Sequence, residues 1–451
     1  MVKEFKTLIV EKNSRSREIQ INTIFNIVFR ALSVLCNFFI VPLALLYINK
    51  TEYGVWLTLT SLTAWLSYMD VGLGNGLRNK LAEAIAKGDK NLAREYVSTT
   101  YVIFTIVILS LFFIFSIINI FFNWNDILKT SIDPKILLST VFLIVSSFCV
   151  RLVLDLAGTV VIALQKTFLR TLIDFSINLA TLIVIYLLAK SASPSFELFS
   201  AAVAIIPLVV LFVFNYLLYW KSRFSYLKPR LKYFKFDNIK SLLNVGVQFF
   251  FIQFVGIIIF STDNILITQF FSPAYVTSFN IAYKYFTIST VAFTVIMIPY
   301  WSAFTNAYVS NDIKWINNAF KKLLRLWLIQ VVGVVLLIMV ANFVYRIWVG
   351  DKITIPFSLS VSLGVYSIIF NWNNIFAYFI NGVSKIRLQL YSSIFIGLVN
   401  IPLSYVLIKY TSLGLSAIVI ANSLCLLISS VWSPIQCYKI ISNKATGLWN
   451  K

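Results

Sequence analysis

The sequence predicts an all-α, polytopic membrane protein with about twelve transmembrane helices in two six-helix bundles. Hydrophobic residues make up 59% of the 451 residues and charged residues only 12%, and the mean hydropathy is +0.85. Soluble proteins are about 45–50% apolar and about 25% charged, so this chain carries too little charge to coat a water-facing surface. Two further observations, the number of apolar segments and the positions of the basic residues, give the topology.

Apolar segments long enough to cross a bilayer recur along the whole chain. A spanning helix needs about 20 mostly apolar residues. Strand-like alternation is absent from the sequence, so a helical bundle is the expected spanning structure. The expected spans are 21–46, 54–77, 98–121, 136–163, 169–189, 197–220, 241–269, 276–306, 324–348, 356–380, 388–409 and 414–437.

Lysine and arginine are concentrated on one side of this predicted topology. Of the 38 basic residues, 28 fall in the two termini and in the loops on the same side, whereas seven fall in the opposite loops. Because cytoplasmic loops carry the excess of Lys and Arg, we expect both termini in the cytoplasm. The net charge of +21 is then explained by orientation and by contact with anionic lipid headgroups. No segment is long enough to form a basic nucleic-acid-binding domain.

Two short matches indicate that the chain is built from two similar halves. Glu52–Val55, at the start of the second span, lines up with Ala274–Thr277 at the start of the eighth. The Gly-Asp pair at 88–89 lines up with the Asn-Asp pair at 311–312, at nearly the same offset. Parallel repeats of this kind are typical of transporters. We expect an N-terminal six-helix bundle, a basic cytoplasmic linker and a C-terminal six-helix bundle at 1–220, 221–240 and 241–451.

The missing residue types exclude several kinds of chemistry. There is no histidine, hence no histidine metal site, histidine proton relay or Ser-His triad. The four cysteines stand singly in or beside apolar runs, without metal-type spacing. No P-loop motif is present. We therefore expect no catalytic residue, no metal centre and no cofactor.

Ionisable residues inside the predicted spans are the main functional candidates, because such a side chain costs several kcal/mol unless it is paired or faces water. Guanidinium and ammonium groups suit phosphate. We therefore assign Arg30, Arg151 and Lys284 to an anionic group of a substrate. Three carboxylates are assigned to a coupling ion: Asp70, Asp155 and Asp263.

Pairing inside the protein is the alternative for these charges. Arg151 and Asp155 are four residues apart and share a helix face, as are Arg170 and Asp174. For Arg151 and Asp155, at mid-depth in the fourth span, we favour a water-filled cavity. Structural pairing accounts for Arg170 and Asp174 equally well, because this arginine can reach the membrane interface.

The other four charged residues lie at depths in the membrane that allow two further ion pairs. Arg30 and Asp70 are both in the inner half of the first two spans, and Asp263 and Lys284 are both in the outer half of the seventh and eighth. Ion pairing is therefore nearly as good an account of Asp70 and Asp263 as coupling-ion binding.

The tenth span contains a polar run, Asn371-Trp372-Asn373-Asn374, that does not suit a lipid-facing surface. Amides and aromatic rings are what a sugar-binding site uses, so we also assign Asn373 and Asn374 to the substrate. The alternative is hydrogen bonding between helices, which is the commoner role for any single one of these residues.

Five motifs carry a resemblance that extends over nearly the whole chain. They are Tyr53–Trp56 (YGVW), Asp70–Glu83 (DVGLGNGLRNKLAE), Thr262–Ile267 (TDNILI), Asn381–Arg387 (NGVSKIR) and Asn400–Ser404 (NIPLS). In this order and spacing they resemble the polysaccharide-unit flippases, the Wzx-like O-antigen transporter group of the MOP exporter superfamily. Asp70 and Asp263 stand at positions typical of this group.

The resemblance implies a MATE-like arrangement of two bundles around a cavity that opens alternately to the cytoplasm and the periplasm. It implies a flippase, not an enzyme, whose substrate is an undecaprenyl-pyrophosphate-linked oligosaccharide, an O-antigen or related surface polysaccharide unit. The implied setting is the bacterial inner membrane, with a proton or sodium gradient as the driving force. The implied partners are membrane lipids and other polysaccharide-assembly membrane proteins, but not nucleic acid.

Two other functions fit parts of the sequence. A small-molecule or multidrug antiporter can share the same fold, because fold alone does not select the substrate; the intramembrane cations disfavour it. A membrane polysaccharide polymerase is the second. Such an enzyme is expected to place reactive groups in a sizeable outer loop, and the longest outer segment here, 122–135, is short.

Overall fold

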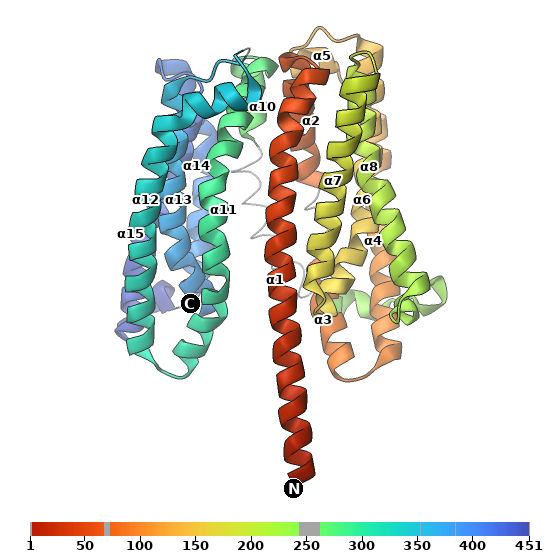
Figure 1. Cartoon of the computed structure of the whole chain (residues 1–451), viewed down its shortest axis with the longest axis vertical. Helices are drawn as coiled ribbons and strands as arrows, with labels where there is room; N and C mark the ends of the chain where they lie inside the picture. The colour runs from red at the N-terminus through yellow and green to blue at the C-terminus, as the bar shows by residue number, and fades with distance from the viewer. Residues whose placement is uncertain (1, 67–72, 243–261, 352, 384, 451) are drawn as a thin grey trace. The chain divides into compact units, whose positions relative to one another are not determined.

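The computed structural model describes residues 2–66, 73–242, 262–351, 353–383 and 385–450 (Figure 1). It divides into two compact units, unit 1 (Met1–Gln253) and unit 2 (Phe254–Lys451). Every regular element within the described ranges is a helix, as predicted. Eight of these helices are long and apolar enough to cross a membrane. The chain is therefore a multi-pass membrane protein.

Unit 1 is formed by helices that run alongside one another (Figure 1). After the last of its long helices come a π-helical turn at Leu217–Lys221 and two short 3-10 helices at Ser225–Leu227 and Leu231–Tyr233. Its described α-helices are α1 (Val2–Tyr47), α2 (Lys50–Leu66), α3 (Leu73–Ala86), α4 (Lys90–Asn119), α5 (Trp124–Leu128), α6 (Pro134–Ala163), α7 (Thr167–Ser191) and α8 (Phe196–Tyr216).

Unit 2 begins its described part with a short helix and continues with five long ones. A 3-10 helix at Gly447–Asn450 follows the last of them. The described α-helices are α10 (Asp263–Phe270), α11 (Pro273–Val309), α12 (Ile313–Val349), α13 (Phe357–Gly382), α14 (Arg387–Tyr410) and α15 (Ser416–Ile441).

Ten of the twelve predicted spans lie wholly within the described residues, and each corresponds to a helix. The second span, 54–77, corresponds to α2 and the start of α3, and residues 67–72 lie outside the described ranges. Of the seventh span, 241–269, residues 243–261 also lie outside them, and the remainder includes most of α10.

Five helix pairings of unit 1 recur in unit 2, whereas the contact between α6 and α7 has no counterpart of similar extent between α13 and α14. In unit 1, α3 packs against α4 and α6, α4 against α6, α6 against α8, and α7 against α8. In unit 2, α11 packs against α12 and α13, α12 against α13, α13 against α15, and α14 against α15. The order along the chain is the same, with α11 in the place of α2 and α3. The two halves predicted from the sequence therefore share one internal architecture.

The matched turns at 88–89 and 311–312 have the same hydrogen-bonding geometry. Gly88 and Asn311 both adopt the left-handed backbone conformation, with φ of 73° and 57°. The backbone N–H of the following aspartate donates to the carbonyl five residues earlier, at 3.0 Å for Asp89 and 2.8 Å for Asp312. Each carboxylate then accepts the backbone N–H three residues later, at 2.9 Å, and so caps α4 or α12. The two halves therefore share the same backbone conformation and the same capping hydrogen bonds at these turns.

The basic segment 221–240 is folded onto α4. Arg94 on α4 donates from Nε to the carbonyl of Tyr226 at 3.0 Å. Ser98 and Thr99 accept backbone N–H groups of this segment, at 3.2 Å and 3.1 Å. Because these backbone groups find acceptors on α4, the segment predicted as a linker is fixed to unit 1.

Candidate functional site

A cavity of about 450 Å³ lies in unit 1 and is lined by residues of α2, α6 and α8. One wall carries hydroxyl groups and an aromatic ring, and another carries two charged side chains. These lining residues are Trp56, Thr60 and Thr63 from α2, and Ser147, Arg151 and Asp155 from α6. The cavity expected beside Arg151 and Asp155 is therefore present, whereas their roles in binding stay predictions.

Arg151 lies near the middle of α6. It is twelve residues from the C-terminal end of that helix at Ala163, which corresponds to about 18 Å along the helix axis. Within the described residues, Arg151 forms no ion pair. An unpaired guanidinium at this depth is costly unless it faces water or an anion. The cavity provides the space for either.

Arg170, near the start of α7, bridges two carboxylates. Its Nη1 lies 2.6 Å from Asp155 Oδ1, and its Nη2 lies 3.3 Å from Asp174 Oδ1. The predicted pairing of Arg170 with Asp174 is confirmed. Among the described residues, Asp155 forms its ion pair with the arginine of the neighbouring helix and not with Arg151. This contact depends on the packing of α6 against α7, which sequence spacing does not reveal.

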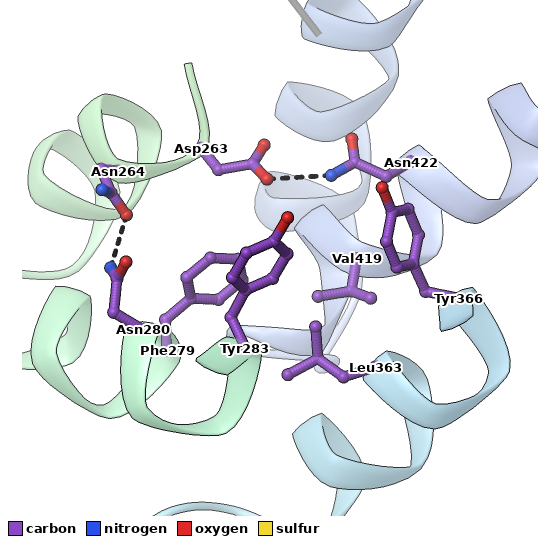
Figure 2. Close-up of a pocket in the computed structure, with 9 residues that line it drawn as sticks. All are labelled: Asp263, Asn264, Phe279, Asn280, Tyr283, Leu363, Tyr366, Val419 and Asn422. Atoms are coloured by element: carbon purple, nitrogen blue, oxygen red, sulfur yellow. Dashed lines mark hydrogen bonds between the residues drawn. The ribbon is translucent and has the colours of Figure 1, made fainter. Parts of the chain in front are cut away.

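A second candidate site lies in unit 2, around Asp263 at the start of α10 (Figure 2). Asp263 lines a small cavity of about 70 Å³, and only 7% of the residue is exposed. Asn422 Nδ2 on α15 donates to its Oδ2 at 2.9 Å. The other oxygen, Oδ1, is buried and has no hydrogen-bond partner among the described residues. Lys284, the partner expected by depth, forms no ion pair with Asp263 or with any other described residue.

Asn422 connects Asp263 to α14. Asn400 Nδ2 donates to Asn422 Oδ1 at 2.6 Å, so the three side chains form a continuous buried chain. Asn400 Oδ1 and the Ser404 hydroxyl on the same helix are also buried, with no hydrogen-bond partner in the described part of the chain. Two of the sequence motifs, 262–267 and 400–404, therefore meet through a residue that the sequence analysis missed. The only signal for Asn422 was an amide within the twelfth predicted span, which also contains Gln436.

Two tyrosines complete this site. Figure 2 shows Tyr283 from α11 and Tyr366 from α13 with their hydroxyls on the side of the cavity where Asp263 meets Asn422. Both tyrosines, together with Leu363, also line an adjoining cavity of about 200 Å³. The site is thus a buried carboxylate surrounded by neutral polar groups.

The remaining cations lie on helices of different units. Arg30 is exposed on α1 and Lys284 is half-buried on α11. Neither forms an ion pair with a described residue. Asp70 lies outside the described residues, so its pairing with Arg30 is untested. The assignments of all three residues stay predictions.

The amides of the tenth span contact neighbouring helix atoms. Asn373 Nδ2 donates to Ser430 Oγ at 2.9 Å and to the Leu426 carbonyl at 3.2 Å, which links α13 to α15. Asn374 Nδ2 donates to Asn371 Oδ1 at 3.5 Å. Neither Asn373 nor Asn374 lines the cavities described above. The contacts of Asn373 are those of the interhelical alternative, and a role in substrate binding is untested.

Comparison with known proteins identifies relatives by sequence. No family model matches the chain. A protein of Salmonella typhi named "Putative O-antigen transporter" is 23% identical over 362 residues, which cover 76% of this chain and 78% of the relative. A protein of Salmonella typhimurium with the same name is 21% identical over 359 residues, with the same coverage.

Solved structures give the fold. An inward-facing multidrug resistance MATE family transporter of the MOP superfamily aligns with a TM-score of 0.77 and 14% identity, over 94% of this chain and 100% of the other. An outward-facing structure of a transporter described in the same words aligns with a TM-score of 0.65 and 15% identity, over 94% and 96% of the two chains. The resemblance predicted from the sequence is therefore confirmed: this is a multi-pass membrane protein with the fold of the MOP-superfamily transporters, similar in sequence to proteins named as O-antigen transporters.

Proposed function

We propose that the protein is a flippase for undecaprenyl-pyrophosphate-linked oligosaccharide units of a surface polysaccharide. It moves them across the bacterial inner membrane by alternating access, driven by an ion gradient. The names of its relatives and its fold support a transporter. The observation that carries the substrate class is the Arg151 guanidinium, which lines a cavity at mid-depth of a membrane helix and has no ion pair with a described residue.

The pyrophosphate is the part of this substrate that the membrane opposes most. Moving an ionised phosphate into hydrocarbon without a partner is prohibitively costly. A guanidinium offers charge-assisted hydrogen bonds to phosphate, which contribute about 1.5–3 kcal/mol each. The hydroxyls of Thr60, Thr63 and Ser147 line the same cavity. Those of Thr60 and Thr63 donate to backbone carbonyls of α2, so their oxygens remain to accept hydrogen bonds from sugar hydroxyls. The polyprenyl tail stays in the lipid.

Asp263 is the proposed coupling site. A buried carboxylate with one hydrogen bond is too costly to remain ionised alone, so it takes a proton or a small cation. Its unpaired Oδ1 is the atom that binds either one. Asp155 is a weaker candidate, because its carboxylate already pairs with Arg170 at 2.6 Å. Asp70 is retained as a candidate from its position in the sequence.

The proposed setting follows from the topology. Both termini lie in the cytoplasm, as the distribution of basic residues indicates. Contact with membrane lipids and with other polysaccharide-assembly membrane proteins is part of this proposal. No covalent chemistry is required, since the substrate crosses the membrane unchanged.

Deletion of the protein in its own bacterium tests this function. Complete lipid-linked units are expected to accumulate in the cytoplasmic leaflet, and the plasmid-borne protein is expected to restore export. Accumulation of outward-facing, unpolymerised units would instead indicate a polymerase. Normal polysaccharide with increased drug sensitivity would indicate a multidrug exporter.

Arg30→Gln and Lys284→Gln are each expected to abolish export of the surface polysaccharide in the complemented deletion strain. Each substitution removes a cation that no described residue neutralises. Immunoblotting of membrane fractions checks that the variants insert at the normal level. Arg30→Lys and Lys284→Arg, which keep the charge, are expected to retain part of the export. Full export by both glutamine variants would remove these two residues from the proposed substrate path.

A further inference from the structure

Arg170, and not the helix neighbour Arg151, forms the ion pair with Asp155. Arg151 and Asp155 are four residues apart on α6 and share a helix face, the spacing at which opposite charges pair. In the structure, Asp155 is instead bound by Arg170, at 2.6 Å. Arg170 contacts Asp174 at the longer distance of 3.3 Å. The cluster holds two cations and two anions, yet the cation that lines the cavity is the one without an ion pair among the described residues.

We propose that Arg170 is a positioning residue that reserves Arg151 for the anionic group of the substrate. By occupying Asp155, Arg170 prevents the pair that Arg151 would otherwise form. The inference rests on the proposed function, because it assumes that an anion enters the cavity.

The geometry of the guanidinium suits this role. One of its nitrogens points to Asp155 on α6 and another to Asp174 on α7, so a single planar group serves both carboxylates. Lysine presents one compact ammonium and does not reproduce this fork. With Arg170 removed, two carboxylates remain for one cation, and Arg151 is the cation that shares a helix face with Asp155.

Gly158 provides the space in which Arg170 lies. It is buried on α6, three residues after Asp155. A Cβ atom built on Gly158 overlaps the Nη1 atom of Arg170, the same atom that contacts Asp155. Glycine at this position therefore allows the guanidinium to lie against α6. A larger residue at this position requires the Arg170 guanidinium to shift from where it contacts Asp155.

The start of α7 is also held in place by α1. Thr171, beside Arg170, donates from Oγ1 to Asn26 Oδ1 at 2.7 Å. Asn26 Nδ2 donates to Thr167 Oγ1 at 2.9 Å. These bonds fix the turn of α7 that carries Arg170, so the loss of its guanidinium need not move the helix.

Binding of a prenyl pyrophosphate to the purified full-length protein in nanodiscs tests the inference. Arg170→Gln is expected to raise the Kd about tenfold or more, although Arg151 is intact, as expected when one charge-assisted hydrogen bond is lost. The double variant Arg170→Gln/Asp155→Asn is expected to bind more tightly than Arg170→Gln alone, because the neutral amide in place of the Asp155 carboxylate cannot neutralise Arg151, although the Asp174 carboxylate remains. Gly158→Ala is expected to weaken binding in the same way without changing any charge, and Asp155→Asn is expected to rescue it too.

The outcomes separate this inference from the proposed function. Wild-type binding of Arg170→Gln, or a double variant as weak as Arg170→Gln alone, would overturn the role of Arg170. Failure of the wild-type protein to bind the probe, or tight binding by Arg151→Gln, would overturn the proposed function itself. Thermal denaturation of each variant in detergent identifies any variant that fails to fold. If Arg170→Gln fails to fold, Gly158→Ala tests the role of Arg170 in its place.

Discussion

Arg151→Gln is expected to reduce export of the lipid-linked units about tenfold or more, with normal insertion in the membrane. Arg151 lines the unit 1 cavity and forms no ion pair with a described residue. Glutamine keeps the length and polarity of the side chain but removes its charge-assisted bonds to phosphate, which contribute about 1.5–3 kcal/mol each. Surface polysaccharide in the complemented deletion strain measures the effect.

Arg346→Gln is the matched control for this variant. Arg346 forms an ion pair with Asp351 at 2.8 Å, but both side chains are more than 70% exposed. Exposed ion pairs contribute little to stability, so export should be unchanged. Arg151→Lys keeps the charge but not the fork, and we expect an intermediate result. Full export by Arg151→Gln would mean that the unit 1 cavity does not bind the phosphate group.

Asp263→Asn is expected to abolish accumulation driven by an ion gradient while leaving substrate binding intact. The neutral side chain can still accept the hydrogen bond from Asn422, but it no longer needs a proton or cation. Proteoliposomes with an imposed proton gradient, or an imposed sodium gradient, provide the measurement. If one of the two gradients drives accumulation by the wild-type protein but not by the variant, the ion of that gradient is the coupling ion.

Asp237→Asn is a suitable control for the second variant. Asp237 is exposed in the basic segment that follows α8, and its substitution is expected to leave gradient-driven transport unchanged. If Asp263→Asn still accumulates substrate against a gradient, the coupling site must lie elsewhere. Asp70 would then be the next carboxylate to substitute.

The sequence was sufficient to predict the fold, because hydropathy and charge distribution act through the membrane itself. A segment of about 20 apolar residues has no other stable location than the bilayer, and basic loops orient the bundle. The repeat was also predictable at its turns. A left-handed residue followed by an aspartate at 88–89 and at 311–312 is a local feature that needs no knowledge of packing.

The partners of the buried charges were predictable only within one helix. The pair of Arg170 with Asp174 follows from helical spacing. The stronger contact of Arg170 with Asp155 depends on how α6 and α7 pack, and on the absence of a side chain at Gly158. No pattern in the sequence of either helix alone specifies that register.

The partner of Asp263 was also not predictable from the sequence, because it lies far away along the chain. Its amide partner Asn422 is 159 residues away along the chain. The polar run of the tenth span was the more conspicuous signal, yet Asn373 uses its amide nitrogen to link α13 to α15. Composition indicates that a span contains polar groups, but only packing determines which of them face a cavity.

Transfer of a labelled lipid-linked oligosaccharide between leaflets tests the central claim most directly. The purified protein is reconstituted into sealed vesicles that carry an ion gradient. A membrane-impermeant reagent then reports the fraction of sugar exposed on the outside. We expect the wild-type protein to move the sugar across the bilayer and Arg151→Gln to leave it in its original leaflet. Equal transfer by both proteins, or no transfer by the wild type, would contradict the account.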